Sequence, residues 1–113
     1  MTLRGKTILV TGAAGMLGRD LAPLLEDAGT RPLLTDNRTP GDAGPSISRL
    51  DITDQEAVKD IVQHERPDWI VNCAAYTNVD QAETDYQTAF QVNAFGPARL
   101  AAALRESGGK LLH

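Results

Sequence analysis

Residues 7–18, TILVTGAAGMLG, decide the fold of this chain. The apolar and β-branched start of this stretch predicts a buried strand, and the glycines after it predict a turn into a helix, because apolar residues then recur at helical spacing. In such a unit Gly12 allows a tight turn, Gly15 lets the backbone approach a pyrophosphate, and Gly18 lets helix and strand pack closely. Taken alone, however, a glycine turn of this kind also occurs in α/β proteins that bind no nucleotide.

Composition limits the class of protein. A chain of 113 residues with 42% hydrophobic and 23% charged residues suits one small domain with a single core. The net charge of -4 disfavours nucleic acid and anionic membrane surfaces as partners. No apolar run approaches the roughly 18 residues of a membrane span, and no signal peptide is recognised. The single cysteine, Cys73, excludes an internal disulfide and fits a cytoplasmic location.

The glycine turn leads into a predicted helix that ends at Gly29, with Pro23 expected to kink it. Its predicted core-facing stripe consists of Leu17, Leu21, Leu24, Leu25 and Ala28. A second short strand, residues 31–35, follows and stops at Asp36. A loop without periodicity, residues 37–46, then stands where many doubly wound domains have a helix.

The next elements are a weak third strand at residues 47–52 and a helix that starts at a capping box, Thr53 to Glu56. Pro67 is expected to end that helix. Residues 68–75, DWIVNCAA, are nearly all apolar, which is typical of a strand covered on both faces.

Two helical stretches are predicted near Asp80 and from near Asn93, with an interruption at Gly96-Pro97 and an end at Gly108-Gly109. Residues 110–113 then predict a fifth strand that is cut off as it begins. Strands that alternate with helices predict an α/β fold of the Rossmann type, with a doubly wound parallel sheet in the order 3-2-1-4-5. The whole chain, residues 1–113, is therefore expected to form one nucleotide-binding domain. Its crevice should open between strands one and four, lined by the glycine turn and residues 75–78.

Asp36 is the first candidate binding residue outside the glycine turn. It lies 24 residues after Gly12, close to the offset of the acidic residue that binds the adenosine ribose in dinucleotide-binding domains. A carboxylate there would favour NAD, whereas Arg38 could pair with the 2′-phosphate of NADP. The alternative is that Asp36 only opens a turn with Asn37.

Asp51 and Ile52 end the third strand beside the expected adenine slot. Asp51 could accept a hydrogen bond from the adenine amino group while Ile52 covers the ring. It is equally open that Asp51 only helps Thr53 to begin the next helix.

Other reactive residues have simpler interpretations. Asp80, Glu83 and Asp85 are not joined by histidine or cysteine, so they are expected on a solvated helix face and no metal site is predicted. His64 suits the C-terminal end of a helix, and Cys73 suits a small packing position rather than thiol chemistry.

Four segments of the chain resemble one family: TILVTGAAGMLGRDLAPLL, LDITDQEAV, RPDWIVNCAAYTNVDQAE and VNAFGPARLAAA. Together they are similar to the N-terminal part of the dTDP-4-dehydrorhamnose reductases, which are extended short-chain dehydrogenases/reductases. The glycine turn is shared by the whole superfamily, whereas NCAAYTNVDQAE is more specific to this branch. The resemblance implies NADH- or NADPH-dependent reduction of the 4-keto group of a dTDP-deoxysugar, in the route to dTDP-L-rhamnose.

The resemblance also implies a role for individual residues. It places the pyrophosphate on Gly12, Gly15, Met16 and Leu17, the ribose on Asp36, adenine beside Asp51 and Ile52, and the inner part of the cofactor along Ala74, Ala75, Tyr76 and Thr77. Asn93 matches the helix asparagine that supports the active site in relatives.

The chain departs from this family in two ways. The family's catalytic groups are a Ser or Thr and a Tyr-x-x-x-Lys pair, but Tyr76 and Tyr86 are followed four residues later by Asp80 and Phe90. The domain is therefore expected to be incomplete, without catalytic residues, and to meet a nucleotide-sugar substrate only within a full-length parent. The loop at residues 37–46 is also long for this family, which leaves open a related sugar-nucleotide epimerase or dehydratase.

A different class of function also remains open. Some proteins of this fold act as interaction or regulatory modules without chemistry. A fifth strand that barely forms leaves a sheet edge uncovered, and such an edge could support self-association.

Overall fold

The computed structural model describes residues 3–37, 46–74 and 91–112. Within them, one parallel sheet has the strand order β3-β2-β1-β4-β5, which confirms the predicted order. The strands are β1 (Thr7–Thr11), β2 (Arg31–Asp36), β3 (Ser48–Arg49), β4 (Trp69–Asn72) and β5 (Lys110–Leu112). Because β1 lies at the centre, the glycine turn that follows it emerges in the middle of the sheet.

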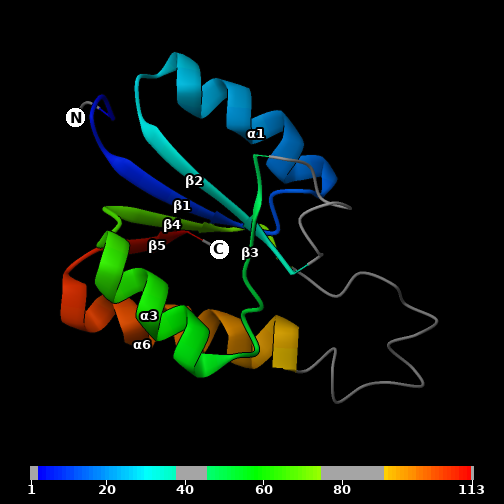
Figure 1. Cartoon of the computed structure of the whole chain (residues 1–113), viewed down its shortest axis with the longest axis vertical. Helices are drawn as coiled ribbons and strands as arrows, with labels where there is room; N and C mark the ends of the chain where they lie inside the picture. The colour runs from blue at the N-terminus through cyan, green and yellow to red at the C-terminus, as the bar shows by residue number, and fades with distance from the viewer. Residues whose placement is uncertain (1–2, 38–45, 75–90, 113) are drawn as a thin grey trace.

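Helices cover both faces of this sheet. They are α1 (Met16–Asp27), α3 (Gln55–Glu65) and α6 (Gly96–Ser107), with a π-helical turn, η1 (Gln91–Phe95), directly before α6. In Figure 1, α1 lies on one face, and α3 and α6 lie side by side on the other. The described chain is therefore a three-layer α/β arrangement, as the alternation of strands and helices predicts.

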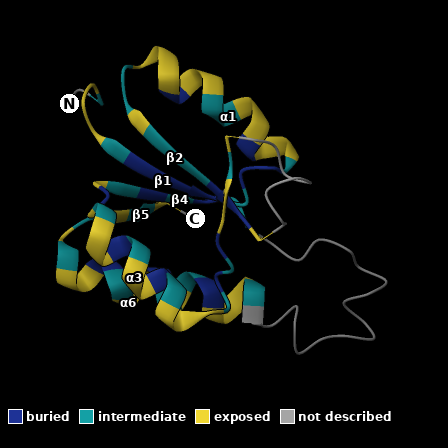
Figure 2. Cartoon of the chain, in the orientation of Figure 1, coloured by how far each residue is buried: buried dark blue, intermediate teal, exposed yellow. Residues whose placement is uncertain are grey.

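The core has two halves, separated by the sheet. Leu9 and Ile70 pack with residues of α3 and α6, such as Val62 and Leu100. Ile8 and Val10 point the other way and pack in a second cluster that includes Leu25 of α1. Figure 2 shows this burial along β1 and on the inner sides of the helices. The continuous apolar run of β1 is explained by this burial on both faces.

The predicted stripe on α1 is wrong at three positions. Leu17 and Leu24 are 66% and 64% exposed, Ala28 is exposed as well, and the buried residues of this helix are Gly18 and Leu25. The reason is close packing at Gly18, where an added Cβ would lie 2.6 Å from the Cα of Ala13. That contact turns the Gly18–Leu25 side of the helix toward the sheet. Pro23 lies within α1 as expected.

The ends of α1 and α3 follow capping rules, with one correction. Gly29 directly follows the C-cap of α1 and has a φ of +78°, as its predicted role requires. The N-cap of α3, however, is Asp54, whose Oδ1 accepts a hydrogen bond from the Ala57 N–H at 3.1 Å. Thr53 does not cap the helix because its N–H and hydroxyl both donate to Asp51. Pro67 follows the left-handed C-cap of α3 and stops the helix, as predicted.

Several elements are shorter than predicted. Among the described residues the fourth strand spans Trp69–Asn72, because its neighbour β1 ends at Thr11, where the Cys73 N–H makes the last bond, to the Thr11 carbonyl at 3.0 Å. The third strand pairs only over Ser48–Arg49. The predicted interruption at Gly96-Pro97 is the junction between η1 and α6. The helix predicted near Asp80 lies outside the described residues.

Candidate functional site

Gly12 occupies a position that only glycine can fill. Its φ is +66°, and an added Cβ would lie 2.5 Å from the backbone nitrogen of Ala74. The positive φ strains any residue with a Cβ, and the short distance shows that the turn after β1 contacts the chain after β4. The predicted role of Gly12 in a tight turn is confirmed, and the close approach to Ala74 explains it further.

Gly15 and Gly18 differ in what surrounds them. Gly18 is packed against the backbone of Ala13, which confirms its predicted role in bringing the helix close. A Cβ added at Gly15 would have only the Gly12 carbonyl oxygen near it, at 3.4 Å, and Gly15 is the N-cap of α1 without a side-chain cap. Gly15 consequently offers no side-chain acceptor to the first N–H groups of α1. The backbone at Gly15 is therefore not covered by a side chain on the side that faces the neighbouring space.

That space is a hollow of about 530 Å³ at the carboxyl ends of the strands. Its lining includes every predicted cofactor-binding residue that the structure describes: Gly12, Gly15, Met16, Leu17, Asp36, Asp51, Ile52 and Ala74. Val92 of η1, Asn37 and Cys73 contribute as well. The remaining predicted residues, Ala75, Tyr76 and Thr77, lie outside the described residues. Residues spread over most of the sequence thus meet at one crevice.

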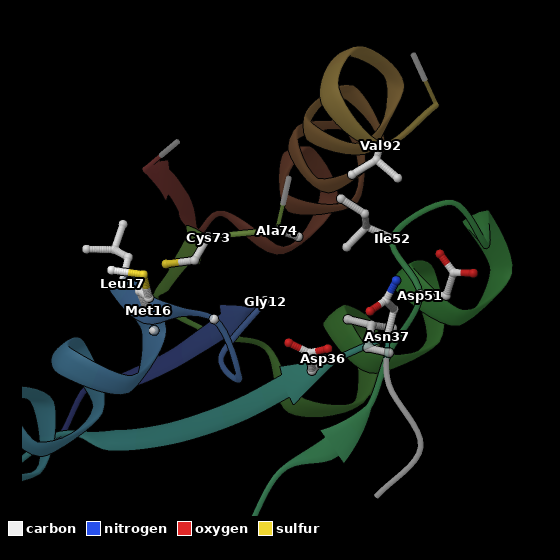
Figure 3. A pocket seen from close by; sticks show the side chains of 13 residues that line it. Gly12, Met16, Leu17, Asp36, Asn37, Asp51, Ile52, Cys73, Ala74 and Val92 are labelled. Carbon is white, nitrogen blue, oxygen red and sulfur yellow. The ribbon is translucent and has the colours of Figure 1, made fainter. Parts of the chain in front are cut away.

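The hollow has two chemically different ends. In Figure 3, Met16, Leu17 and Cys73 lie together at one end, whereas Asn37 and Asp51 lie at the other. One end is therefore apolar, and the other offers carboxylate and amide groups. An elongated ligand with one polar sugar-like end would match this division.

Asp36 has a structural bond in addition to its predicted role. It is only 5% exposed, and its Oδ2 accepts a hydrogen bond from the Ala14 N–H at 3.0 Å. The Ala13 N–H donates to the Thr35 carbonyl at 2.8 Å beside it. These bonds fasten the glycine turn to the end of β2. Binding of a ribose by Asp36 stays a prediction.

Asp51 has the structural role that the sequence left open, which is to help Thr53 begin the next helix. Its Oδ1 accepts from both the N–H of Thr53, at 2.9 Å, and the Thr53 hydroxyl, at 2.7 Å. Asp51 still lines the hollow, next to Ile52, which is also part of the core. The turn before α3 therefore depends on Asp51, and its contact with adenine stays a prediction.

A buried polar pair that sequence reasoning missed lies beneath the crevice. The Thr11 hydroxyl donates to Oδ1 of Asn72 at 2.5 Å, and the Ala74 N–H donates to the same oxygen at 3.2 Å. The side chains of Thr11 and Asn72 are both buried. The signal in the sequence was a polar residue at the end of each of two apolar strands, but the register of β1 and β4 was needed to pair them.

The remaining candidate residues fall as follows. Cys73 is half-buried and packs against the Ile8–Val10 cluster, and this burial raises the pKa of its thiol. Asn93 is exposed on η1, and its supporting role in an active site stays a prediction. His64 lies in the last turn of α3, where its charge would suit the helix dipole.

The described residues give no sign of two other kinds of site. No group of three or more potential metal ligands is found in residues 3–37, 46–74 and 91–112. Asp80, Glu83 and Asp85 lie outside that part of the chain. Over the same described ranges, no helix has the length and apolar character needed to cross a membrane.

The fold and the crevice define a Rossmann-type α/β domain with a glycine turn at its topological switch point. Comparison with known families then gives the particular relationship. The family model described as "RmlD substrate binding domain" matches residues 6–113, and the chain belongs to this family.

Individual relatives agree with this assignment. The chain is 46% identical over 106 residues to a dTDP-4-dehydrorhamnose reductase of Streptomyces griseus, and the match covers 92% of the chain and 31% of the relative. It thus spans about a third of the length of the curated relatives that it matches, in their N-terminal part.

Solved structures with the same fold include two with a bound cofactor. The dTDP-4-dehydrorhamnose reductase of Bacillus anthracis, in complex with NADP, is 36% identical with a TM-score of 0.79, covering 94% of this chain and 34% of that chain. The UDP-glucose 4-epimerase of Thermus thermophilus, in complex with NAD, is 29% identical with a TM-score of 0.80, covering 93% and 36%.

Proposed function

We propose that this chain is the cofactor-binding part of a dTDP-4-dehydrorhamnose reductase. In this role it binds NADH or NADPH and takes part in reduction of the 4-keto group of a dTDP-deoxysugar, in the route to dTDP-L-rhamnose. The observation that carries the proposal is the bare backbone at Gly15, at the start of α1 and facing the hollow. The family of the chain supplies the reaction.

The glycine turn suits a pyrophosphate. The first turn of α1 offers N–H groups that its own N-cap does not bond, and the residues of that turn, Met16 to Arg19, include no acidic side chain. Negative charge is favoured at such a helix end. A side chain at Gly15 would enter the hollow that this residue lines, so glycine keeps the approach open.

The two ends of the hollow suit the two ends of a dinucleotide. We assign the adenosine to the polar end, with its ribose at Asp36 and its adenine near Asp51 and Ile52. Sugar hydroxyls donate hydrogen bonds, and the carboxylate of Asp36, which lines the hollow, can accept them. The inner part of the cofactor is assigned to the apolar end, along Ala74.

The bound cofactor would supply a hydride to the substrate carbonyl. The chain's own residues would hold the pyrophosphate, orient the adenosine and exclude water from the apolar end. Polarisation of the carbonyl and delivery of a proton belong, by family resemblance, to a Ser or Thr and a Tyr-x-x-x-Lys pair. These 113 residues contain no such Tyr-x-x-x-Lys pair. We therefore expect binding without turnover from this chain alone.

Isothermal titration calorimetry with NADH and NADPH at millimolar concentration tests this proposal. Gly15→Asp places a carboxylate at the predicted pyrophosphate position and should abolish the binding heat. Ala101→Asp adds the same charge at an exposed position of α6 and should leave the heat unchanged. Incubation with a dTDP-4-keto sugar should give no cofactor oxidation. No heat with the unsubstituted chain, or equal heat with Gly15→Asp, would contradict the proposal.

A second candidate is a non-catalytic interaction module, and one observation favours it. β5 is the outermost strand of the described sheet on its side, and its Leu112 is 56% exposed. An open edge with an apolar side chain can pair with another copy of the chain. This candidate predicts an oligomer that forms regardless of cofactor.

A further inference from the structure

We propose that Arg49 is the residue by which this site accepts the 2′-phosphate of NADP, so that the chain binds NADP at least as tightly as NAD. The inference rests on the proposed function, that the hollow holds a dinucleotide. It concerns a residue on β3, which lies 37 residues after Gly12 and directly follows the loop after β2.

The sheet register places Arg49 beside Asp36. The two residues are paired Cα partners of β2 and β3, and the strands are parallel, so their side chains leave the sheet on the same face. The positions two residues earlier, Leu34 and Ile47, both pack against the cluster on the α1 side. By strand alternation, Asp36 and Arg49 face that side too.

The Arg49 side chain extends toward the rim of the hollow. Its Nε donates a hydrogen bond to the Asn37 carbonyl at 3.5 Å, and Asn37 itself lines the hollow. Arg49 is exposed, and no carboxylate of residues 3–37, 46–74 and 91–112 forms an ion pair with it. Its positive charge is therefore not neutralised by the described part of the protein, and it stands next to the residue assigned to the ribose.

The guanidinium of Arg49 changes the effect of Asp36 on the choice between NAD and NADP. Asp36 would by itself repel a 2′-phosphate and favour NAD. Its Oδ2 is already bonded to the Ala14 N–H, which fixes the carboxylate against the glycine turn. Arg49, on the neighbouring strand, can offset the repulsion and bond the phosphate oxygens with several N–H groups. An acidic and a basic residue thus lie at register partners of two neighbouring strands, and together they let the site bind both NAD and NADP.

The test compares two ligands that differ by one phosphate. Dissociation constants for NADP⁺ and NAD⁺ are measured by calorimetry on the 113-residue chain. Arg49→Ala should weaken NADP⁺ binding about tenfold, the scale of a lost charge-assisted bond, and should change NAD⁺ binding by less than about twofold. Arg49→Lys should restore part of the NADP⁺ affinity. Arg105→Ala removes the same charge from the end of α6 and should alter neither constant.

Arg38→Ala is measured in parallel, because the sequence alone offers Arg38 as the phosphate partner. If Arg38→Ala selectively weakens NADP⁺ and Arg49→Ala does not, the assignment to Arg49 is overturned. Equal weakening of both ligands by Arg49→Ala would also overturn it, since that result indicates damage to the strand edge. An unsubstituted chain that binds neither ligand would overturn the proposed function, and with it this inference. Unchanged NADP⁺ affinity in Arg49→Ala, beside normal NAD⁺ binding, would overturn the Arg49 assignment alone.

Discussion

The hydroxyl of Thr11 and the side-chain amide of Asn72 form a buried hydrogen bond across the ends of the two central strands, 61 residues apart in sequence. The same amide oxygen accepts the N–H of Ala74, whose nitrogen lies where a Cβ on Gly12 would clash. This oxygen therefore links the end of β1 to the chain after β4, together with the bond from the Cys73 N–H to the Thr11 carbonyl.

Loss of this bond should destabilise the domain. Thr11→Val keeps the shape of the side chain but leaves the Asn72 amide with fewer partners in a buried place. We expect the free energy of unfolding to fall by about 1–2 kcal/mol, measured by urea denaturation. Thr7→Val is the control on the same strand, because the Thr7 hydroxyl makes no hydrogen bond with the described residues. Equal losses in the two variants would show that the Thr11–Asn72 bond contributes nothing of its own.

Gly12→Ala should lower the free energy of unfolding more than an alanine substitution at another glycine with a positive φ. It combines the backbone strain of a positive φ with an overlap on Ala74, so a loss of about 3 kcal/mol is expected. Gly108→Ala is the matched control, because its φ is +86° but nothing lies within 4 Å of the added Cβ. That variant should lose only about 1 kcal/mol. Urea denaturation of both variants measures the difference, and similar losses would contradict the packing argument.

The thiol of Cys73 should react slowly at neutral pH. Burial raises its pKa, so the protonated form persists to a higher pH than in an unfolded chain, and the thiolate is the reactive species. Alkylation by iodoacetamide, followed by mass spectrometry, should therefore rise with pH around a midpoint above the roughly 8.5 of an ordinary thiol. The chain in urea is the control, and its single cysteine makes the signal unambiguous. A midpoint below that of the unfolded chain would contradict the expectation.

The open edge at β5 gives a test of the interaction candidate. If copies pair along this edge, sedimentation velocity should show an oligomer that grows with concentration and is unaffected by cofactor. Leu112→Lys places a charge on the edge strand and should give a monomer. Leu24→Lys changes another exposed leucine, on α1, and should leave the oligomer intact. A chain that stays monomeric at its highest soluble concentration would rule the candidate out.

The fold was predictable because its signals are local. The apolar run before Gly12, the alternation of strands with helices and the stop at Pro67 each depend on neighbouring residues. Handedness rules then leave few ways to order the strands. The position of Asp36 followed in the same way, since it ends the strand that comes next after the glycine turn.

The errors and omissions have a common cause, which is dependence on contacts far away in sequence. Leu24 fits a helical stripe, but close packing at Gly18 decides which side of α1 faces the sheet. Thr53 has the residue type of an N-cap, but Asp51 already engages its hydroxyl. The positions of Asn72 and Arg49 gain their meaning only from strand register. Periodicity carries no information about register between separate strands.

The central place of β1 also affects how the domain folds. Its partner β2 arrives after one short crossover, whereas β4 pairs with it across a separation of about sixty residues, as the Thr11–Asn72 bond illustrates. Closing the longer loop costs more chain entropy, so we expect the β1–α1–β2 unit to assemble early and β4 to insert late. Stopped-flow refolding can check this order, with helical signal preceding protection of Cys73 from alkylation. The crevice is completed only by that last insertion, so ligand binding would report the end of folding rather than its beginning.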